Sequence, residues 1–592
     1  MSDYQFPYKD AAFVLNDLLG FEQRCAEAGL EDINAELAEA ILEEAARLGS
    51  EVFAPLNSVG DNLGASLGEN GVEETPGFAD AYRQYADAGW ASLAAEEQYG
   101  GQKMPRMLAA AVMEIWDTSN LGLALCPLLT NGAVDAITTH GSDELKDTYL
   151  PDMVSGNWTG SMCLTESAAG SDLAAVGTKA IPKDDHYLIS GQKIFITWGD
   201  HQMTENIIHL VLARLPDAPA GVGGISLFLV PKFILDESGR PGKRNDAYCV
   251  GIEHKLGIHG SPTCTLNFGD NGGAVGYLVG KPHNGLMAMF TMMNEARQGV
   301  GIQGLGVSER SYQQALAFAK ERIQGTRKDG SRYPIIKFPD VRRMLMQMKS
   351  ATEAMRGLAY FAAAEADRSH WANSPEEAKK HAARNELYTP LVKGWITEFA
   401  QEITSYGVQV HGGMGYIEET GSAQYFRDAR ILPIYEGTTG IQGLDLTGRK
   451  ILMDKGQVLQ ELLDAIQATA DEMANVSSLT KMAGSLSKSV KDAHEAMVWL
   501  LQNAATDRNA IGGISVNLMM LLGFVCGGWV MGQSTLKAGQ LLDADSGDTK
   551  FLQAKQVTAQ FYFEHFLPRT ESYLTTIKAG SESMMALDEE LF

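Results

Sequence analysis

Cysteine is scarce in this chain, with only six among 592 residues, and no two of them form a C-x-x-C pair. The histidines form no cluster at metal-ligand spacing either. This pattern argues against zinc and suits a reducing compartment. We therefore predict a cytoplasmic protein without a bound metal.

Positive charge is also in short supply. The chain has 48 lysines and arginines against 74 aspartates and glutamates, which gives a formal net charge of −26. Because nucleic-acid phosphates demand a basic surface, nucleic acid is not an expected partner. The acidic balance favours solubility, and any anionic ligand would need its own arginine, lysine and backbone N–H donors.

The chain shows little sign of a targeting or membrane segment. Its start, MSDYQFPYKD, has neither a basic n-region nor an apolar h-region, so we expect no secretory signal. Residues 511–532 carry no charged side chain and are long enough to span a bilayer. This stretch holds Ser515, Asn517 and six glycines, which favours a closely packed helix of the C-terminal domain. A membrane-contacting helix is the alternative.

What is present is the composition of a large globular protein, with 45% hydrophobic and 21% charged residues. A chain of 592 residues exceeds one ordinary core, so we expect three or four domains. No repeat or low-complexity tract is evident.

The coarse pattern runs from helices to strands and back to helices. Residues rich in strong helix formers, or with apolar side chains every three or four positions, predict helices at 33–48, 78–93, 107–125, 312–323, 341–359 and 391–403. β-Branched runs predict strands at 187–197, 207–213, 225–230 and 264–268. Residues 57–76 read as a Gly/Asn-rich loop and 97–101 as a turn. The later helices predict a bundle, followed by a further helical domain after residue 450.

The most informative stretch is 409–443, QVHGGMGYIEETGSAQYFRDARILPIYEGTTGIQG. Its Gly412-Gly413-x-Gly415 turn lets backbone N–H groups approach and hold a phosphate. Glu436 follows the apolar residues 431–435, where loss of water makes a carboxylate a stronger base or raises its pKa. A phosphate cradle before such a base predicts an enzyme with a nucleotide-like cofactor; the alternative is a glycine turn beside a surface glutamate.

This stretch resembles the acyl-CoA dehydrogenase family, since the turn, Arg427-Asp428, Y-E-G-T and Gln442 occur in the family's order. The resemblance covers roughly residues 40–450 and implies an α+β, mainly α fold. We expect an N-terminal helical domain with an extension at 1–159, a middle β domain at 160–280, a C-terminal helical bundle at 281–450 and an additional helical domain at 451–592. Longer family members carry such a tail.

The resemblance also implies roles within 409–443. Glu436 is the expected catalytic base, with Tyr435 and Gly437 beside the substrate. The expected FAD contacts here are Gln409, Gly412, Gly413, Gly415, Thr438 and Gln442.

A second motif, MCLTESAAGSD at 162–172, resembles the family's C-x-T-E-P-x-A-G-S-D loop. The expected cofactor contacts are Met162, Cys163, Leu164, Thr165 and Ser171, and Ser171 is also expected at the acyl-CoA. Ser167 stands where the family has proline, which loses a rigid φ but no donor. A plain Thr/Ser/Gly turn is the alternative.

A third motif, GQKIFITWG at 191–199, resembles G-x-K-x-[WF]-I-T-N. By resemblance, Phe195 covers the flavin face and Thr197 hydrogen-bonds near flavin N5, with Ile196 between them at the cofactor. An aromatic residue on a strand is more often part of a core, so Phe195 has that alternative. Trp198 stands where the family usually has asparagine.

Two arginines complete the pattern. Arg297, in Asn294-Glu295-Ala296-Arg297, is expected near bound acyl-CoA together with Asn294. Arg322 is expected at the FAD pyrophosphate of a neighbouring subunit, because guanidinium binds phosphate bidentately. Asn294 and Gln324 replace the family's Asp and Phe, and each arginine alone could be a solvated helix charge.

Two further glycine patterns are not expected to be functional. Residues 299–304 fit G-x-G-x-x-G but follow no strand, so we predict close helix packing instead of a dinucleotide site. Residues 64–68 fit G-x-S-x-G, but the sequence before them predicts a loop, whereas a nucleophile elbow requires a preceding strand.

The resemblance implies an FAD-dependent α,β-dehydrogenation of an acyl-CoA thioester to a trans-2-enoyl-CoA. Glu436 removes the α proton, the β hydride passes to flavin N5, and the electrons leave to an electron-transfer flavoprotein. The Glu436 N–H and a ribityl hydroxyl stabilise the thioester oxygen. We expect a homodimer, since FAD is shared between subunits and the tail could replace a second dimer, and we expect no membrane span.

The acyl group is less constrained. Length and tail resemble long family members that act on 3-methylmercaptopropionyl-CoA in dimethylsulfoniopropionate breakdown, which predicts 3-methylthioacryloyl-CoA as the product. The alternatives are a short- or medium-chain fatty acyl-CoA dehydrogenase of β-oxidation and an acyl-CoA oxidase. A non-catalytic flavin-fold binding protein and a hydrolase are alternatives of another class.

Overall fold

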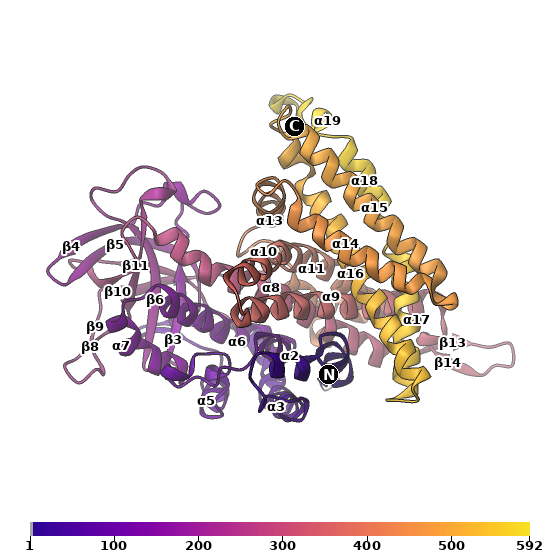
Figure 1. Ribbon diagram of the computed structural model, residues 1–592. Coiled ribbons are helices and arrows are strands. Elements are labelled where there is room, and N and C mark those ends of the chain that lie inside the picture. Colours follow the sequence, from indigo (N-terminus) through magenta and orange to yellow (C-terminus); the bar gives the residue numbers. More distant parts are fainter. Residues whose placement is uncertain (1–3) are drawn as a thin grey trace. The chain divides into compact units, whose positions relative to one another are not determined.

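The computed structural model describes residues 4–592, so the first three residues of the expected 1–159 domain and of the MSDYQFPYKD start lie outside it. The chain folds into two compact units. Of the described residues, the helical unit comprises 4–44, 106–114 and 300–592, and the sheet unit comprises 45–105 and 115–299. Figure 1 shows the strands of the sheet unit in purple and magenta.

The sheet unit is built on one large mixed sheet. Its strands follow the order β10-β11-β5-β12-β7-β6-β3, with β4 pairing to β5 and β6. Their bounds are β3 Trp158–Cys163, β4 Lys179–Lys183, β5 His186–Thr197, β6 Asn206–Arg214, β7 Ile225–Pro231, β10 Ala247–Ile252, β11 Thr263–Phe268 and β12 Ala274–Val279. Two hairpins stand apart, β1 Ser66–Gly68 with β2 Gly71–Glu73 and β8 Phe233–Leu235 with β9 Pro241–Arg244.

Both faces of this sheet are buried in its central strands β6 and β7, where apolar residues occupy most positions. On β6, Leu210 joins one core while Val211 joins the other, as the alternation of a strand requires. The first core also holds residues of α6 (Arg106–His140), α7 (Asp143–Val154) and the start of α8 (Gly285–Glu321). The four predicted strands are confirmed, each within two residues at either end. Near-continuous apolar runs explain the predictions at 207–213 and 225–230.

The predicted loop at 57–76 is wrong. Residues of that stretch continue α4 (Ala54–Leu63) and then form the β1–β2 hairpin. Gly60 allows the helix because a Cβ there would lie 2.9 Å from the Phe78 ring, so this glycine serves close packing and not a turn. The remaining helices before the sheet are α3 Ala35–Leu48 and α5 Phe78–Asp87.

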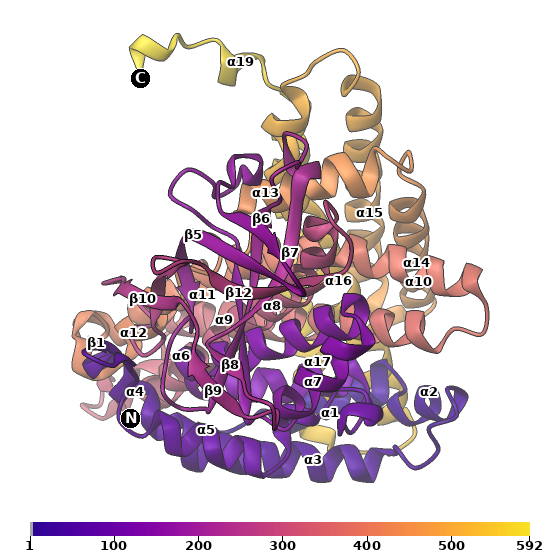
Figure 2. The same ribbon diagram turned by 90° about the vertical axis from the view of Figure 1, so that its left-hand side faces the viewer.

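The helical unit contains two sets of helices. The first is the later part of α8 with α9 Pro339–Trp371, α10 Pro375–Pro390, α11 Ile396–His411, α12 Ser422–Ala429 and α13 Thr439–Leu444. The second is α14 Gln457–Ala474, α15 Thr480–Asn503, α16 Ala510–Asp543, α17 Thr549–His565, α18 Arg569–Lys578 and α19 Glu582–Met585. Short N-terminal helices α1 Tyr8–Ala12 and α2 Phe21–Glu27 also belong to it. Figure 2 shows the C-terminal segment with α19 extending from the helices before it.

Glycines in these helices mark close helix contacts. A Cβ on Gly301 of α8 would lie 2.3 Å from Val392, so the prediction of helix packing at 299–304 is confirmed. The same holds in α16, where a Cβ on Gly523 would lie 2.1 Å from the Trp395 ring. Two helices, α6 and α16, are long and apolar enough to cross a membrane, and the α16 window is 67% buried within the protein. α16 packs against α9, α15 and α17 of its own unit.

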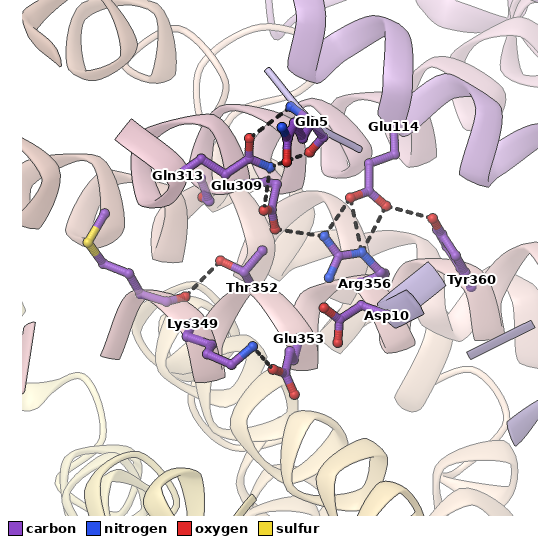
Figure 3. Close-up of polar contacts among 12 residues, drawn as sticks. Gln5, Asp10, Glu114, Glu309, Gln313, Lys349, Thr352, Glu353, Arg356 and Tyr360 are labelled. Carbon is purple, nitrogen blue, oxygen red and sulfur yellow. Dashed lines mark hydrogen bonds and ion pairs between the residues drawn. The ribbon is translucent and has the colours of Figure 1, made fainter. Parts of the chain in front are cut away.

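A buried ionic cluster joins distant segments of the helical unit (Figure 3). Arg356 of α9 donates to Glu114 at 2.7 Å and to Glu309 at 2.8 Å, and Tyr360 donates to Glu114 at 2.6 Å. Lys555 of α17 pairs with both Glu353 of α9 and Asp10 of the N-terminal segment. The cluster therefore ties the N-terminal segment, α6, α8, α9 and α17 together.

Candidate functional site

The glycine turn begins where α11 ends. Gly412 has φ +60, a conformation that favours glycine, and no described heavy atom lies within 4 Å of a Cβ placed on Gly412 or Gly413. Both are exposed, as is Gln409 in the last turn of the helix. Gly415 is different, since its Cβ would lie 2.3 Å from the Val408 carbonyl oxygen. The turn therefore presents open backbone at two glycines and is closed by the third.

Arg322 lies next to this turn through a stack of side chains. Its guanidinium lies over the Phe318 ring at 4.8 Å, and the Phe318 ring lies 4.5 Å from the ring of His411, the last residue of α11. His411 Nδ1 lies 2.7 Å from the Gly407 carbonyl. The structure thus brings together the expected phosphate arginine and the expected phosphate turn, which are ninety residues apart at Arg322 and Gly412.

Glu436 lies in a strained loop. Its φ is +55 and that of Gly437 is +95, so two successive residues have left-handed backbone. A glutamate in this region costs about 1–3 kcal/mol, and such strain persists only where the surroundings enforce it. Thr438 then caps α13, where its hydroxyl accepts the Ile441 N–H at 3.3 Å.

Four side chains hold this loop. Lys393 Nζ donates to the Gly437 carbonyl at 2.6 Å, and Gln442 donates to the Glu436 carbonyl at 3.2 Å. Thr439 donates to Glu398 of α11 at 2.5 Å. Tyr435 donates to Gln303 of α8 at 2.5 Å. The structure therefore uses Gln442 and Thr438, both expected at the cofactor, to shape the backbone around Glu436.

In the sheet unit, the second motif forms a loop braced by a buried ion pair. Lys193 of β5 is fully buried, and its Nζ lies 2.7 Å from Glu166 and 3.0 Å from the Leu164 carbonyl. Glu166 also accepts the Gly177 N–H at 2.7 Å and the Thr178 hydroxyl at 2.6 Å. Burial opposes its charge, but Lys193 and these donors hold the pKa of Glu166 below its usual range.

The third motif lies on a β-bulge of β5. The pairing with β11 jumps from Ile196 opposite Cys264 to Lys193 opposite Leu266, so two residues of β5 face one of β11. Phe195 lies in this bulge with φ +59 and is 58% exposed, so the alternative of a core aromatic is wrong. The Ile194 N–H donates to the Thr165 carbonyl at 2.9 Å, which joins the second and third motifs.

Trp198, which departs from the family pattern, is a structural residue. It is 1% exposed with φ +48, and its Nε1 donates to the Gly122 carbonyl of α6 at 3.0 Å. Its ring also packs on Phe78 and His201. The indole anchors the end of β5 directly after Thr197.

The other expected contacts differ in accessibility. Cys163 and Ile196 are buried in the sheet core, so only their backbones could face a ligand, whereas Ser171 is exposed. Met162, Leu164 and Thr165 precede or begin the braced loop. Arg297 of α8 is 3% exposed, lies 5.8 Å over the Phe290 ring and donates weakly to Asn294 at 3.5 Å.

The helical unit and the sheet unit each contain residues that fit a part of FAD. In the helical unit, Gly412 and Gly413 leave a cradle that a Cβ would fill, beside the cation of Arg322. In the sheet unit, an exposed aromatic ring on a rigid bulge suits stacking on a planar ring system. Among residues 4–592, no group of His, Cys, Asp and Glu side chains gathers as metal ligands would.

Sequence reasoning missed Lys193, Glu166, Lys393 and Glu398. The signal was available at Lys393, which interrupts the apolar run Leu391-Val392-Lys393-Gly394-Trp395. A lysine is almost never fully buried unless it is paired, so a charge inside such a run marks a specific contact.

Domain families match almost the whole chain. The acyl-CoA dehydrogenase N-terminal domain matches residues 68–157, the middle domain 161–271 and the C-terminal domain 283–451. A domain described as acetyl-CoA dehydrogenase C-terminal like matches residues 462–588.

Two curated relatives are similar over their full lengths. 3-Methylmercaptopropionyl-CoA dehydrogenase of Ruegeria pomeroyi is 45% identical over 589 residues, covering 98% of this chain and 99% of the relative. A butyryl-CoA dehydrogenase of Syntrophomonas wolfei is 33% identical, covering 100% and 99%.

Solved structures have the same fold. An acyl-CoA dehydrogenase of Bacillus anthracis complexed with FAD has a TM-score of 0.75 at 21% identity, covering 95% of this chain and 90% of that chain. A chain from a structure described as an electron transferring flavoprotein of Acidaminococcus fermentans has a TM-score of 0.56 at 26% identity, covering 69% and 96%.

Proposed function

Because this chain belongs to the acyl-CoA dehydrogenase family, we propose that Glu436 is the base that removes the α proton of an acyl-CoA thioester. The protein is an oxidoreductase that acts on acyl-CoA and uses FAD as its cofactor. The observation that carries the role of Glu436 is its strained, left-handed backbone, which four side chains hold in place. Strain that is maintained in this way is typical of active sites.

The loop gives Glu436 two ways to act on a thioester. Its carboxylate accepts the α proton, and its backbone N–H donates to the carbonyl oxygen, where negative charge develops as the proton leaves. Gln442 donates to the Glu436 carbonyl and Glu398 holds Thr439, so the segment is ordered before any substrate binds. Pro433 and Leu432 are buried beneath the loop and keep water from that side.

FAD, when bound, supplies the acceptor for the hydride of the β carbon. In the helical unit, Gly412, Gly413 and Arg322 would hold its pyrophosphate, since the glycines leave open backbone and Arg322 supplies a cation. In the sheet unit, Thr165, Phe195 and Thr197 would hold and cover the flavin ring, with Glu166 and Lys193 bracing the Thr165 loop. Gln409, Gly415 and Ser171 complete these surfaces.

The proposed substrate is 3-methylmercaptopropionyl-CoA, which would be converted to 3-methylthioacryloyl-CoA in dimethylsulfoniopropionate breakdown. Support comes from the 45% identity to the Ruegeria enzyme of that name over nearly the whole chain, against 33% to a butyryl-CoA dehydrogenase. Arg297, Asn294 and Ser171 are the proposed contacts to the CoA moiety. A fatty acyl-CoA of short or medium length is the second candidate.

Electrons are proposed to leave to an electron-transfer flavoprotein, and the protein is proposed to be a homodimer that shares FAD. The similarity to a chain in an electron transferring flavoprotein structure supports the first point. A cytoplasmic location stays a prediction from the cysteine usage.

The role of Glu436 is tested by Glu436→Gln, which keeps shape and hydrogen bonding but removes the base. We expect normal FAD content and a loss of about 10²–10⁴ in turnover with a dye acceptor, since that is the usual contribution of a general base. The exposed Glu419→Gln in the same segment is the matched control and should behave as the wild type. Near-normal turnover of Glu436→Gln would refute the assignment.

The substrate is tested with a panel of acyl-CoA thioesters that includes 3-methylmercaptopropionyl-CoA and butyryl-CoA. We expect kcat/KM for the thioether substrate to exceed that for the straight chains by at least about tenfold, a difference of about 1.4 kcal/mol in transition-state binding. An equal or reversed preference would favour the fatty acyl-CoA candidate. Hydrogen peroxide formation without a dye acceptor would instead indicate an oxidase.

A further inference from the structure

Lys393 is fully buried and lies on an irregular turn. It belongs to η8 (Leu391–Trp395), a single π-helical turn between α10 and α11. Such turns widen a helix locally and are frequent at functional sites. Here the turn places a charged side chain inside the helical unit, where an aliphatic residue would fill the same space at lower cost.

The Lys393 ammonium is directed at the loop of Glu436. Its Nζ lies 2.6 Å from the carbonyl oxygen of Gly437, forty-four residues further along the chain. A charged donor makes a shorter and stronger hydrogen bond than a neutral one, so this contact is the strongest of those on the loop backbone. Gln442 reaches the same carbonyl at 3.4 Å.

The π-helical turn and α11 act together on this loop. On the turn, Lys393 donates to the Gly437 carbonyl. Glu398, one turn later, accepts the Thr439 hydroxyl at 2.5 Å. The peptide after Gly437 is therefore held from the η8–α11 helix and the peptide before it by Gln442 of α13, and together these contacts fix the backbone that follows Glu436.

We propose that Lys393 is a positioning residue for the reaction, which holds the left-handed Glu436-Gly437 backbone in the geometry that proton abstraction requires. This inference rests on the proposed role of Glu436 as the base. Without the ammonium, the Gly437 backbone can rotate toward the ordinary right-handed region. The carboxylate and N–H of Glu436 are then no longer both directed at the thioester.

The test replaces Lys393 with methionine, which keeps the length and volume of the side chain but removes the charge. Proton abstraction is measured alone with (methylthio)acetyl-CoA, whose α hydrogens exchange with D2O and whose β position is sulfur, so that no hydride transfer follows. For Lys393→Met we expect the exchange rate to fall about 100-fold, which is the effect of misplacing a catalytic group by about 1 Å. The affinity for the same thioester, measured by calorimetry, should change less than about threefold, because interactions that are equally strong in the ground state and the transition state are unchanged.

A second readout does not depend on activity. Amide hydrogen–deuterium exchange in a peptide covering 431–442 should speed up in Lys393→Met, with the remaining peptides of the helical unit unchanged. Lys578→Met is the matched control, since Lys578 is 46% exposed and pairs with Glu495 at 2.6 Å on the surface. It should leave the α-hydrogen exchange and the peptide protection as in the wild type.

The outcomes separate this inference from the proposed function. If the wild type exchanges α hydrogens, Glu436→Gln does not, and Lys393→Met exchanges at the wild-type rate, then Lys393 has no positioning role. If Glu436→Gln exchanges normally, the proposed base itself is wrong. Should Lys393→Met fail to fold, Lys393→Gln decides, because its side chain is uncharged and too short to reach the Gly437 carbonyl: normal α-hydrogen exchange in that variant overturns the proposal, and a loss with intact thioester binding supports it.

Discussion

Three residues with unusual backbone lie at or next to the positions that carry the proposed chemistry. Glu436, Phe195 and Trp198 all have positive φ although none is glycine. Each is fixed by specific neighbours: Glu436 through Gln442, Phe195 through the bulge of β5, and Trp198 through α6. Strain of about 1–3 kcal/mol at such positions is tolerated because these contacts outweigh it.

At the residue scale, two glycines of the same turn should respond differently to alanine. Gly413→Ala adds a methyl group to open space, so the apoprotein should keep its melting temperature while FAD affinity falls at least about tenfold if the backbone approaches phosphate. Gly415→Ala places a Cβ 2.3 Å from the Val408 carbonyl oxygen and should lower stability by about 1–3 kcal/mol. Flavin content and thermal unfolding of the apoproteins check both.

The contrast between the two variants provides its own control. If Gly413→Ala retains FAD as tightly as the wild type, the open cradle does not bind the cofactor. If Gly415→Ala unfolds at the wild-type temperature, the turn can relax without cost.

At the element scale, the parallel pair β3 and β6 buries two neutral histidines. His201 accepts the Met203 N–H at Nδ1 and therefore donates from Nε2 to Thr159 of β3 at 2.9 Å. His209 of β6 contacts Ser161 of β3 at 2.7 Å. Burial lowers the pKa of each histidine to about 3, which means that both remain uncharged at neutral pH.

This arrangement predicts that the sheet unit loses stability below neutral pH. Because the folded pKa is below the unfolded value of about 6.5, each histidine contributes stability that is present above pH 6.5 and is lost as the pH falls toward 3. From pH 7.0 to 5.5, the two together should reduce the free energy of unfolding by about 2.5 kcal/mol. Urea unfolding at the two pH values, followed by a probe in the sheet unit, measures this loss.

Single replacements identify the source of the pH dependence. His201→Gln and His209→Gln should each remove about half of the pH-dependent loss, whatever their effect at pH 7. Replacing the exposed His370 in the same way should leave the loss unchanged. If the double variant still loses as much unfolding free energy between pH 7.0 and 5.5 as the wild type, the pH dependence belongs to other groups.

At the scale of the whole molecule, the ionic cluster around Arg356 connects segments from the N-terminus to α17. Burial raises the pKa of Glu114, and although burial opposes the charge of Arg356, the carboxylates of Glu114 and Glu309 raise the pKa of that guanidinium. These groups stabilise one another only as a set, because each alone would be a buried charge.

Arg356→Met should therefore destabilise the helical unit by about 3–5 kcal/mol, since it leaves the carboxylates of Glu114 and Glu309 without their common cation. Thermal unfolding and hydrogen exchange of the N-terminal segment measure the effect. Arg83→Met, which removes an exposed pair with Asp80, is the control and should change little. A small effect of Arg356→Met would mean that water enters and solvates the cluster.

Much of this organisation could be predicted from the sequence because the signals are local. The spacing of apolar residues in 341–359 predicts the helix observed as α9, and the apolar β-branched run at 207–213 predicts the strand observed as β6. The motifs at 162–172, 191–199 and 409–443 identified the family that the domain matches show. Prediction was wrong at 57–76, where Gly60, which serves helix packing, was taken for a loop glycine.

The sequence by itself determined most of the predicted elements, the family and the candidate base Glu436, because periodicity and motif spacing are properties of neighbouring residues. Only the tertiary structure decided that Trp198 is an anchor, that Lys193 braces the Thr165 loop and that Lys393 holds the Gly437 carbonyl. These contacts join residues up to seventy-six positions apart. The residue type at one position does not reveal whether its side chain is buried or which groups it contacts. For a charged side chain, those two properties decide whether it is a solvated surface group or a structural support for the site.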